Sequence, residues 1–69
     1  MPISGKQAIK ILQSKGFVIT RQRGSHVVLT NQTGTGKLTT VVPLHKELRK
    51  GTIRSIAKLA AMKPSDFGL

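Results

Sequence analysis

The segment Gly24-Ser25-His26 carries the groups of this chain that are best suited to acid–base chemistry, and Arg21 and Arg23 lie directly before it. Histidine titrates closest to neutral pH, so one imidazole can both take and return a proton. Each guanidinium can hold a phosphate through paired donors. A base, polar donors and two cations suit transesterification of a ribose-phosphate chain. The segment predicts RNA as substrate, because RNA carries both the phosphate and its own nucleophile, the 2′-hydroxyl.

A structural role is the alternative for His26, with the imidazole packed in the predicted sheet and hydrogen-bonded to a neighbour. Gly24 favours the chemical interpretation, because glycine permits a positive φ and a close approach of the backbone to a ligand. Ser25 adds a hydroxyl and an amide donor beside the ring. We therefore expect His26 to be the catalytic residue, acting as a general base on a ribose 2′-hydroxyl.

His45 is the second histidine, and it lies in the basic sequence Pro43-Leu44-His45-Lys46. A ribonuclease with two histidines uses one as base and one as acid, whereas the alternative for His45 is a surface or capping role. The two histidines are 19 positions apart, and the chain contains only two acidic residues, Glu47 and Asp66. These groups supply too few ligands for a metal site, and two-metal nuclease chemistry needs more carboxylates. We expect no metal and no cofactor.

Positive charge dominates the composition, with twelve Lys or Arg residues against two acids and a net charge of +10. Such a surface attracts polyanions, although a solvated basic face without a partner is the alternative. The only aromatic residues, Phe17 and Phe67, argue against a stacking platform for bases. The expected RNA-binding residues surround the histidines and approach the second predicted helix; they are Arg21, Arg23, Gly24, Ser25, His45, Lys46, Arg49, Lys50 and Arg54.

Length and composition exclude several classes of protein. A chain of 69 residues predicts one domain over 1–69. The absence of cysteine excludes a disulfide framework, a thiolate zinc site and a cysteine nucleophile. No apolar run approaches the ~20 residues that cross a bilayer, and residues 1–6 lack the apolar core of a signal peptide. We expect a cytoplasmic protein without a membrane segment.

The first half of the chain predicts a helix followed by strands. Ser4 and Gln7 form a capping-box pattern, and Gly16 is placed to end the helix in a left-handed conformation, which gives a helix over 5–15. Runs rich in β-branched residues predict strands at 17–22, 26–30 and 38–42, and Arg23-Gly24 predicts a turn between the first two strands. The segment 31–37 contains two glycines and no apolar residue, so we expect a flexible loop there. Pro43 is expected to end the third strand.

The second half predicts a helix and a final turn. Thr52 is the expected N-cap of this helix, and Pro64 is expected to terminate it. The apolar residues Ile53, Ile56, Ala57 and Ala60 recur at helical spacing and should face the sheet. A last turn over 65–67 should place Phe67 against the core. The α-β-β-β-α order predicts an α+β fold: a three-stranded antiparallel sheet with two helices on one face and the other face free.

The motifs also support a family resemblance. Arg21-Gln22-Arg23-Gly24-Ser25-His26, followed by Val42-Pro43-Leu44-His45 and the segment 48–56, resembles the HicA toxins, small mRNA interferases of HicAB toxin–antitoxin systems. The resemblance implies a fold like the double-stranded-RNA-binding domain, catalysis by His26, and a HicB antitoxin that binds the toxin and blocks this site. It implies nothing for the variable loop 31–37.

Two alternatives to an active nuclease remain open. A non-catalytic basic RNA-binding module accounts equally well for the charge and the fold, but it leaves Gly24-Ser25-His26 without a role. The second alternative is a degenerate toxin, which has lost its nuclease activity and is retained only as the bound partner of its antitoxin.

Overall fold

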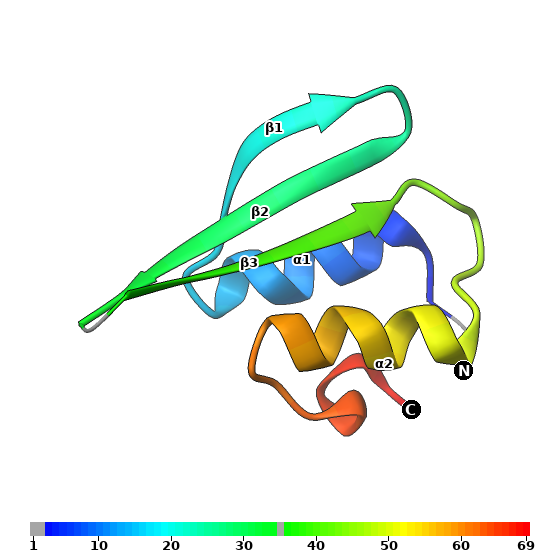
Figure 1. The fold of residues 1–69 in the computed structure, drawn as a ribbon. Coiled ribbons are helices and arrows are strands. Elements are labelled where there is room, and N and C mark those ends of the chain that lie inside the picture. The colour runs from blue at the N-terminus through cyan, green and yellow to red at the C-terminus, as the bar shows by residue number, and fades with distance from the viewer. Residues whose placement is uncertain (1–2, 35) are drawn as a thin grey trace.

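The computed structural model describes residues 3–34 and 36–69, so Met1, Pro2 and Thr35 lie outside the described residues (Figure 1). The elements follow one another as α1 (Gly5–Ser14), β1 (Val18–Arg23), β2 (His26–Thr33), β3 (Gly36–Pro43), α2 (Lys50–Leu59) and a short 3-10 helix, η1 (Pro64–Phe67). The predicted α-β-β-β-α order is confirmed. No helix in these two ranges is long and apolar enough to pass through a lipid bilayer.

The strands form an open antiparallel sheet in the order β1-β2-β3, and both helices lie on the same side of it (Figure 1). This arrangement confirms the predicted fold class and is consistent with a fold like the double-stranded-RNA-binding domain. The side chains of β2 alternate: Val27 and Leu29 are buried beneath the helices, while His26 and Val28 alternate with them and take the other face. We call this other face, which no helix covers, the open face.

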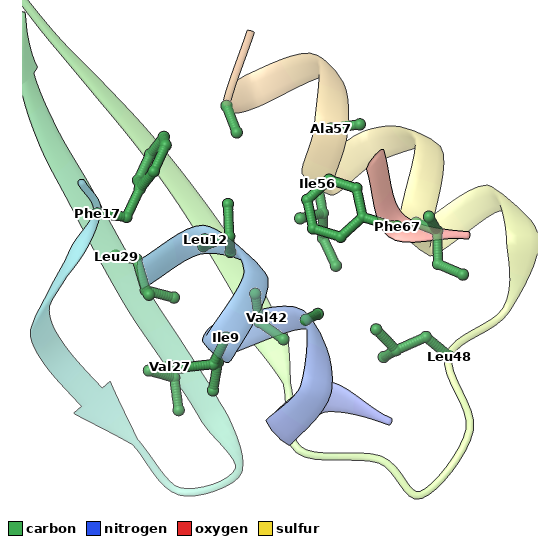
Figure 2. Packing of buried hydrophobic residues seen from close by; sticks show 13 residues of the cluster. Ile9, Leu12, Phe17, Val27, Leu29, Val42, Leu48, Ile56, Ala57 and Phe67 are labelled. Atoms are coloured by element: carbon green, nitrogen blue, oxygen red, sulfur yellow. The ribbon is translucent and has the colours of Figure 1, made fainter. Parts of the chain in front are cut away.

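The core lies between the sheet and the two helices. Figure 2 shows Ile9 and Leu12 of α1 between the sheet and α2, with Val27 and Leu29 on the sheet side. The predicted apolar face of α2 is confirmed, because Ile53, Ile56, Ala57 and Ala60 are all buried. Phe67 packs into the core with only 1% of its surface exposed, as predicted. Thr40, fully buried on β3, links the sheet to α2, because its hydroxyl donates to the carbonyl of Ile56 at 3.2 Å.

Both ends of α1 follow the predicted pattern. The Ser4 hydroxyl accepts from the Gln7 amide at 3.1 Å, and the Gln7 side chain accepts from the Ser4 amide at 2.8 Å. Gly16 has a φ of +96°, and the amide of Phe17 donates to the carbonyl of Leu12 at 3.1 Å. This bond closes a Schellman cap, in which glycine avoids the steric cost of a left-handed residue. The helix ends at residue 14, one residue before the predicted boundary.

The prediction of a flexible loop over 31–37 is wrong for the described part of that segment. β2 continues to Thr33 and β3 begins at Gly36, and the two residues are cross-strand partners. The Thr33 hydroxyl donates to the Gly36 carbonyl at 3.0 Å and closes this end of the hairpin. Three residues of this segment, from 32 to 34, are exposed beyond the core and therefore need not be apolar. The segment thus lacks the apolar pattern from which strands are predicted.

The prediction that Thr52 caps α2 is also wrong. The helix begins at Lys50, and Arg49 occupies the N-cap position without a side-chain cap hydrogen bond. The backbone fixes this start, since the Ile53 amide donates to the Arg49 carbonyl at 3.0 Å. At the other end, α2 stops at residue 59. Pro64 therefore does not terminate α2 itself, and instead begins η1, where a proline fits the first turn.

Candidate functional site

A two-residue turn, Gly24-Ser25, connects β1 to β2 and sets the position of His26. Arg23 and His26 are the cross-strand partners that close this turn. Gly24 has a φ of +57°. A positive φ at the first of two central residues is typical of a type II′ hairpin turn, which favours glycine there. The Gln22 side chain donates to the Gly24 carbonyl at 3.1 Å and braces the turn. The sequence prediction of a turn at this point is confirmed.

His26 is exposed at the start of β2, on the open face of the sheet. Its neighbour Val27 points into the core and is 2% exposed, so the alternation along the strand turns the imidazole away from the helices. The ring does not fill a gap in the packed interior, which was the structural alternative. It is accessible to a ligand that lies across the open face.

A β-bulge in β1 lets Arg21 and Arg23 share the face of His26 while Ile19 turns to the other face. Ile19 pairs with Leu29, but the next paired residue is Arg21, opposite Val28, so Thr20 is an extra residue. Strand residues normally alternate between faces, and one extra residue reverses the alternation after it. Ile19 therefore shares the face of buried Leu29, whereas Arg21 shares the face of Val28.

Arg23 follows by alternation and pairs directly with His26. Side chains of directly opposed residues on adjacent strands have Cβ atoms ~5 Å apart, so Arg23 lies beside the imidazole, and Arg21 is its diagonal neighbour on the same face. The structure thus brings together His26, Arg21 and Arg23 from the set of predicted site residues. All three side chains are exposed.

On the other side of His26, β3 brings in the second predicted histidine segment. His26 pairs with Pro43, and the Leu44 amide donates to the Ser25 carbonyl at 2.7 Å. The segments 24–26 and 43–45 are separated in sequence but lie next to each other at this end of the sheet. The exposed His45 directly follows Leu44. The structure therefore places both histidines in adjoining segments.

The N-terminus of α1 packs against this junction. The Gly5 amide donates to the His45 carbonyl at 2.9 Å, and Gly5 is buried. A Cβ atom built on Gly5 would overlap the carbonyl oxygen of Pro43. Only glycine allows the helix to approach the strand end so closely. The helical layer thus fixes the backbone next to His26, a role for Gly5 that the sequence analysis did not identify.

The remaining predicted RNA-binding residues form a second basic group. Lys46 and Arg49 are exposed in the connection from β3 to α2, and Lys50 and Arg54 are exposed on α2 itself. They belong to the helical side of the fold, whereas Arg21 and Arg23 lie on the open face. A pocket of about 500 Å³ lies beside this second group; its lining residues are Glu47, Leu48, Arg49, Lys50, Ile53, Phe67, Gly68 and Leu69.

Within residues 3–34 and 36–69, no three side chains from His, Asp and Glu gather in a way that could hold a metal ion. The chemistry available at the site is therefore that of an imidazole, a serine hydroxyl, backbone amides and guanidinium groups. Such a set can move protons and can bind a phosphate.

The comparison with protein families decides the identity of this chain. A family model described as the HicA toxin of bacterial toxin–antitoxin matches residues 5–62, which include α1, the whole sheet and α2. The chain belongs to the HicA toxin family. No curated protein in the comparison matches it.

Membership in the HicA family gives this chain the role of the toxin in a toxin–antitoxin system. The match includes the turn with His26, both arginines of the open face and the basic group around α2. It ends before η1, which supplies Phe67 to the core. All residues of the candidate site thus lie within the matched range.

Proposed function

We propose that this HicA toxin is an endoribonuclease, an mRNA interferase, and that His26 is its catalytic residue. The observation that supports the proposal is the exposed imidazole of His26 between Arg23 and Pro43, on a sheet face that no helix covers. Arg21, the cross-strand partner of Val28, lies on the same face. An accessible proton acceptor with two neighbouring cations suits a substrate that contains both a hydroxyl and a phosphate.

The proposed reaction is a transesterification within the RNA. His26 removes the proton from a ribose 2′-hydroxyl, and that oxygen attacks the adjacent phosphorus in line. The bond from phosphorus to the 5′-oxygen of the next nucleotide breaks, the departing oxygen takes a proton from water, and His26 then returns its proton to the solvent. Arg21 and Arg23 stabilise the negative charge that develops on the phosphate oxygens. The products carry a 2′,3′-cyclic phosphate and a 5′-hydroxyl, and the steps require no metal ion.

The regulatory partner in this proposal is an antitoxin of the HicB type. The toxin carries a net charge of +10, and an acidic protein would complement it. Binding over the open face would cover His26 and prevent RNA from reaching it. A small acidic antitoxin should therefore be encoded next to this chain.

End-group analysis of cleaved RNA tests the proposed chemistry. Purified wild-type protein should release fragments with 2′,3′-cyclic phosphate and 5′-hydroxyl ends in the presence of a chelator. The substitution His26→Ala should reduce cleavage by roughly a hundred- to ten-thousand-fold, which is the usual contribution of acid–base catalysis. The variant should still fold, because His26 is exposed. Fragments with 5′-phosphate ends, or unreduced cleavage by the variant, would refute the mechanism.

Growth arrest on induced expression separates the nuclease from a module that only binds RNA. Arrest that disappears with His26→Ala supports catalysis. Arrest that persists with this substitution would favour binding alone.

A further inference from the structure

A hollow on the open face lies further along the strands from His26. It has a volume of about 610 Å³, and its lining residues are Gly16, Val18, Thr20, Thr30, Asn31, Gln32 and Lys37. The proposed reaction uses none of these residues. Thr30 is four residues from His26 on β2, so the two residues lie about 14 Å apart along the strand at ~3.4 Å per residue.

The register places most of the lining on the same face as His26. Thr30 and Gln32 follow His26 at even spacing along β2, and Lys37 pairs with Gln32. Val18 pairs with Thr30, and the hydroxyls of Thr20 and Thr30 are 3.2 Å apart. The hollow therefore opens on the face along which the substrate must run to reach His26.

Between His26 and the hollow, the open-face side chains of β2 and β3 carry no charge. Val28 and Val41 are cross-strand partners in the row next to His26, and Thr30 and Thr39 form the following row. Val41 is 40% exposed. Uncharged apolar atoms offer contacts to the flat faces of ribose and base, whereas phosphates are drawn to Arg21 and Arg23 at one end and Lys37 at the other.

We propose that the hollow binds one unpaired nucleobase of the RNA, a few nucleotides away from the bond that is cleaved. This inference rests on the proposed ribonuclease function and adds a second contact site to it. The Gln32 amide and the hydroxyls of Thr20 and Thr30 are exposed or half-buried donors and acceptors that can pair with a base edge, and Lys37 can hold the adjoining phosphate. A base inside a duplex could not enter, because its edge is already paired. The hollow therefore selects unpaired RNA and makes cleavage depend on the base at one position of the RNA sequence.

The base site is tested by cleaving a pool of unpaired RNA of random sequence and sequencing the ends of the products. Wild-type protein should show a base preference at one position a few nucleotides from the cut, and Gln32→Ala should reduce this preference roughly tenfold, the equivalent of about 1.4 kcal/mol. The matched control is Gln13→Ala, because Gln13 is exposed on α1 in the helical layer. The control should leave the preference unchanged. An identical preference in the wild type and Gln32→Ala, or no preference in the wild type, would overturn the proposal.

Photocrosslinking separates failure of the base site from failure of the nuclease. The His26→Ala variant is bound to RNA that contains 4-thiouridine, and crosslinked peptides are identified by mass spectrometry. Crosslinks should fall on β2 and β3, around Thr30, Gln32 and Lys37. Crosslinks confined to α1 or α2 would overturn the base site even if the wild type cleaves RNA. Crosslinks at the hollow would support it even if the wild type is inactive.

Discussion

Arg23 and His26 are cross-strand partners that close the turn between β1 and β2, and their side chains leave the sheet on the same face. The two-residue turn makes this pairing local, so it depends on Gly24 rather than on distant packing. A cation and a base are thus held at a fixed spacing by backbone hydrogen bonds. This relationship makes Arg23 the basic residue most directly placed to bind the reacting phosphate.

The substitution Arg23→Ala should therefore lower kcat/KM for RNA cleavage by roughly ten- to a hundredfold, since hydrogen bonds to charged groups contribute about 1.5–3 kcal/mol. Lys58→Ala is the matched control, because Lys58 is exposed on α2 and its loss removes the same charge from the helical layer. The control should stay within about twofold of the wild type. Initial rates on one unpaired oligonucleotide provide the measurement, and equal losses in both variants would contradict a specific role for Arg23.

The salt dependence of RNA binding should reveal which basic group follows the backbone. Each phosphate that is neutralised on single-stranded RNA contributes about −0.7 to the slope of log K against log salt. Replacing Arg21 and Arg23 by Gln should flatten the slope by about 1.4 if each contacts one phosphate. A second variant replaces Arg49, Lys50 and Arg54, and we expect its slope to flatten as well. These titrations are made with the inactive His26→Ala protein. An unchanged slope for either variant would show that its replaced residues do not contact the RNA phosphates.

Gly5→Ala should destabilise the fold by about 1–3 kcal/mol, because the new Cβ would overlap the Pro43 carbonyl and the backbone would have to shift. Gly51→Ala is the matched control in the first turn of α2, where a Cβ meets nothing within 4 Å. That change should be neutral or stabilise the protein by up to about 1 kcal/mol, since alanine favours helices. Urea unfolding followed by circular dichroism measures both. Equal midpoints for the two variants would show that the approach of α1 to β3 is not tight.

Thr40→Val tests the hydrogen bond that joins the sheet to α2. The substitution removes the donor to the Ile56 carbonyl while it preserves the shape of the side chain, so stability should fall by about 0.5–1.5 kcal/mol. The loss should be at the lower end of this range, because the Ile56 carbonyl also accepts from the Ala60 amide at 3.0 Å. Thr39→Val, at the exposed neighbouring position, serves as the control and should change stability little. A larger loss in the control than in Thr40→Val would contradict this assignment.

The sequence predicted the order of elements because most of its signals were local. Ser4 and Gln7 marked the start of α1, Gly16 marked its end, and the β-branched runs marked the strands. Where local signals were absent, the prediction failed. The start of α2 at Lys50 has no capping side chain, so Thr52 was the better match to the pattern without being the cap.

The candidate site was predictable only in part. Gly24, Ser25 and His26 are consecutive in sequence, and the turn that precedes His26 followed from residue types. The opposite facing of Ile19 and Arg21 could not be predicted, because it depends on the extra residue at Thr20, and no residue type indicates such a bulge. The contact of Gly5 with the end of β3 depends on how α1 packs in three dimensions, and the sequence contains no sign of it.

The bulge at Thr20 also bears on how this protein tolerates a change of length. Deleting that single residue would restore regular pairing in β1 and leave Arg21 and Arg23 on the open face, because the extra residue has no cross-strand partner of its own. Deleting the paired residue Gln22 would instead move Arg21 to the side of the helices, because strand residues alternate between faces. The site therefore tolerates the loss of a residue at the bulge but not between its two arginines.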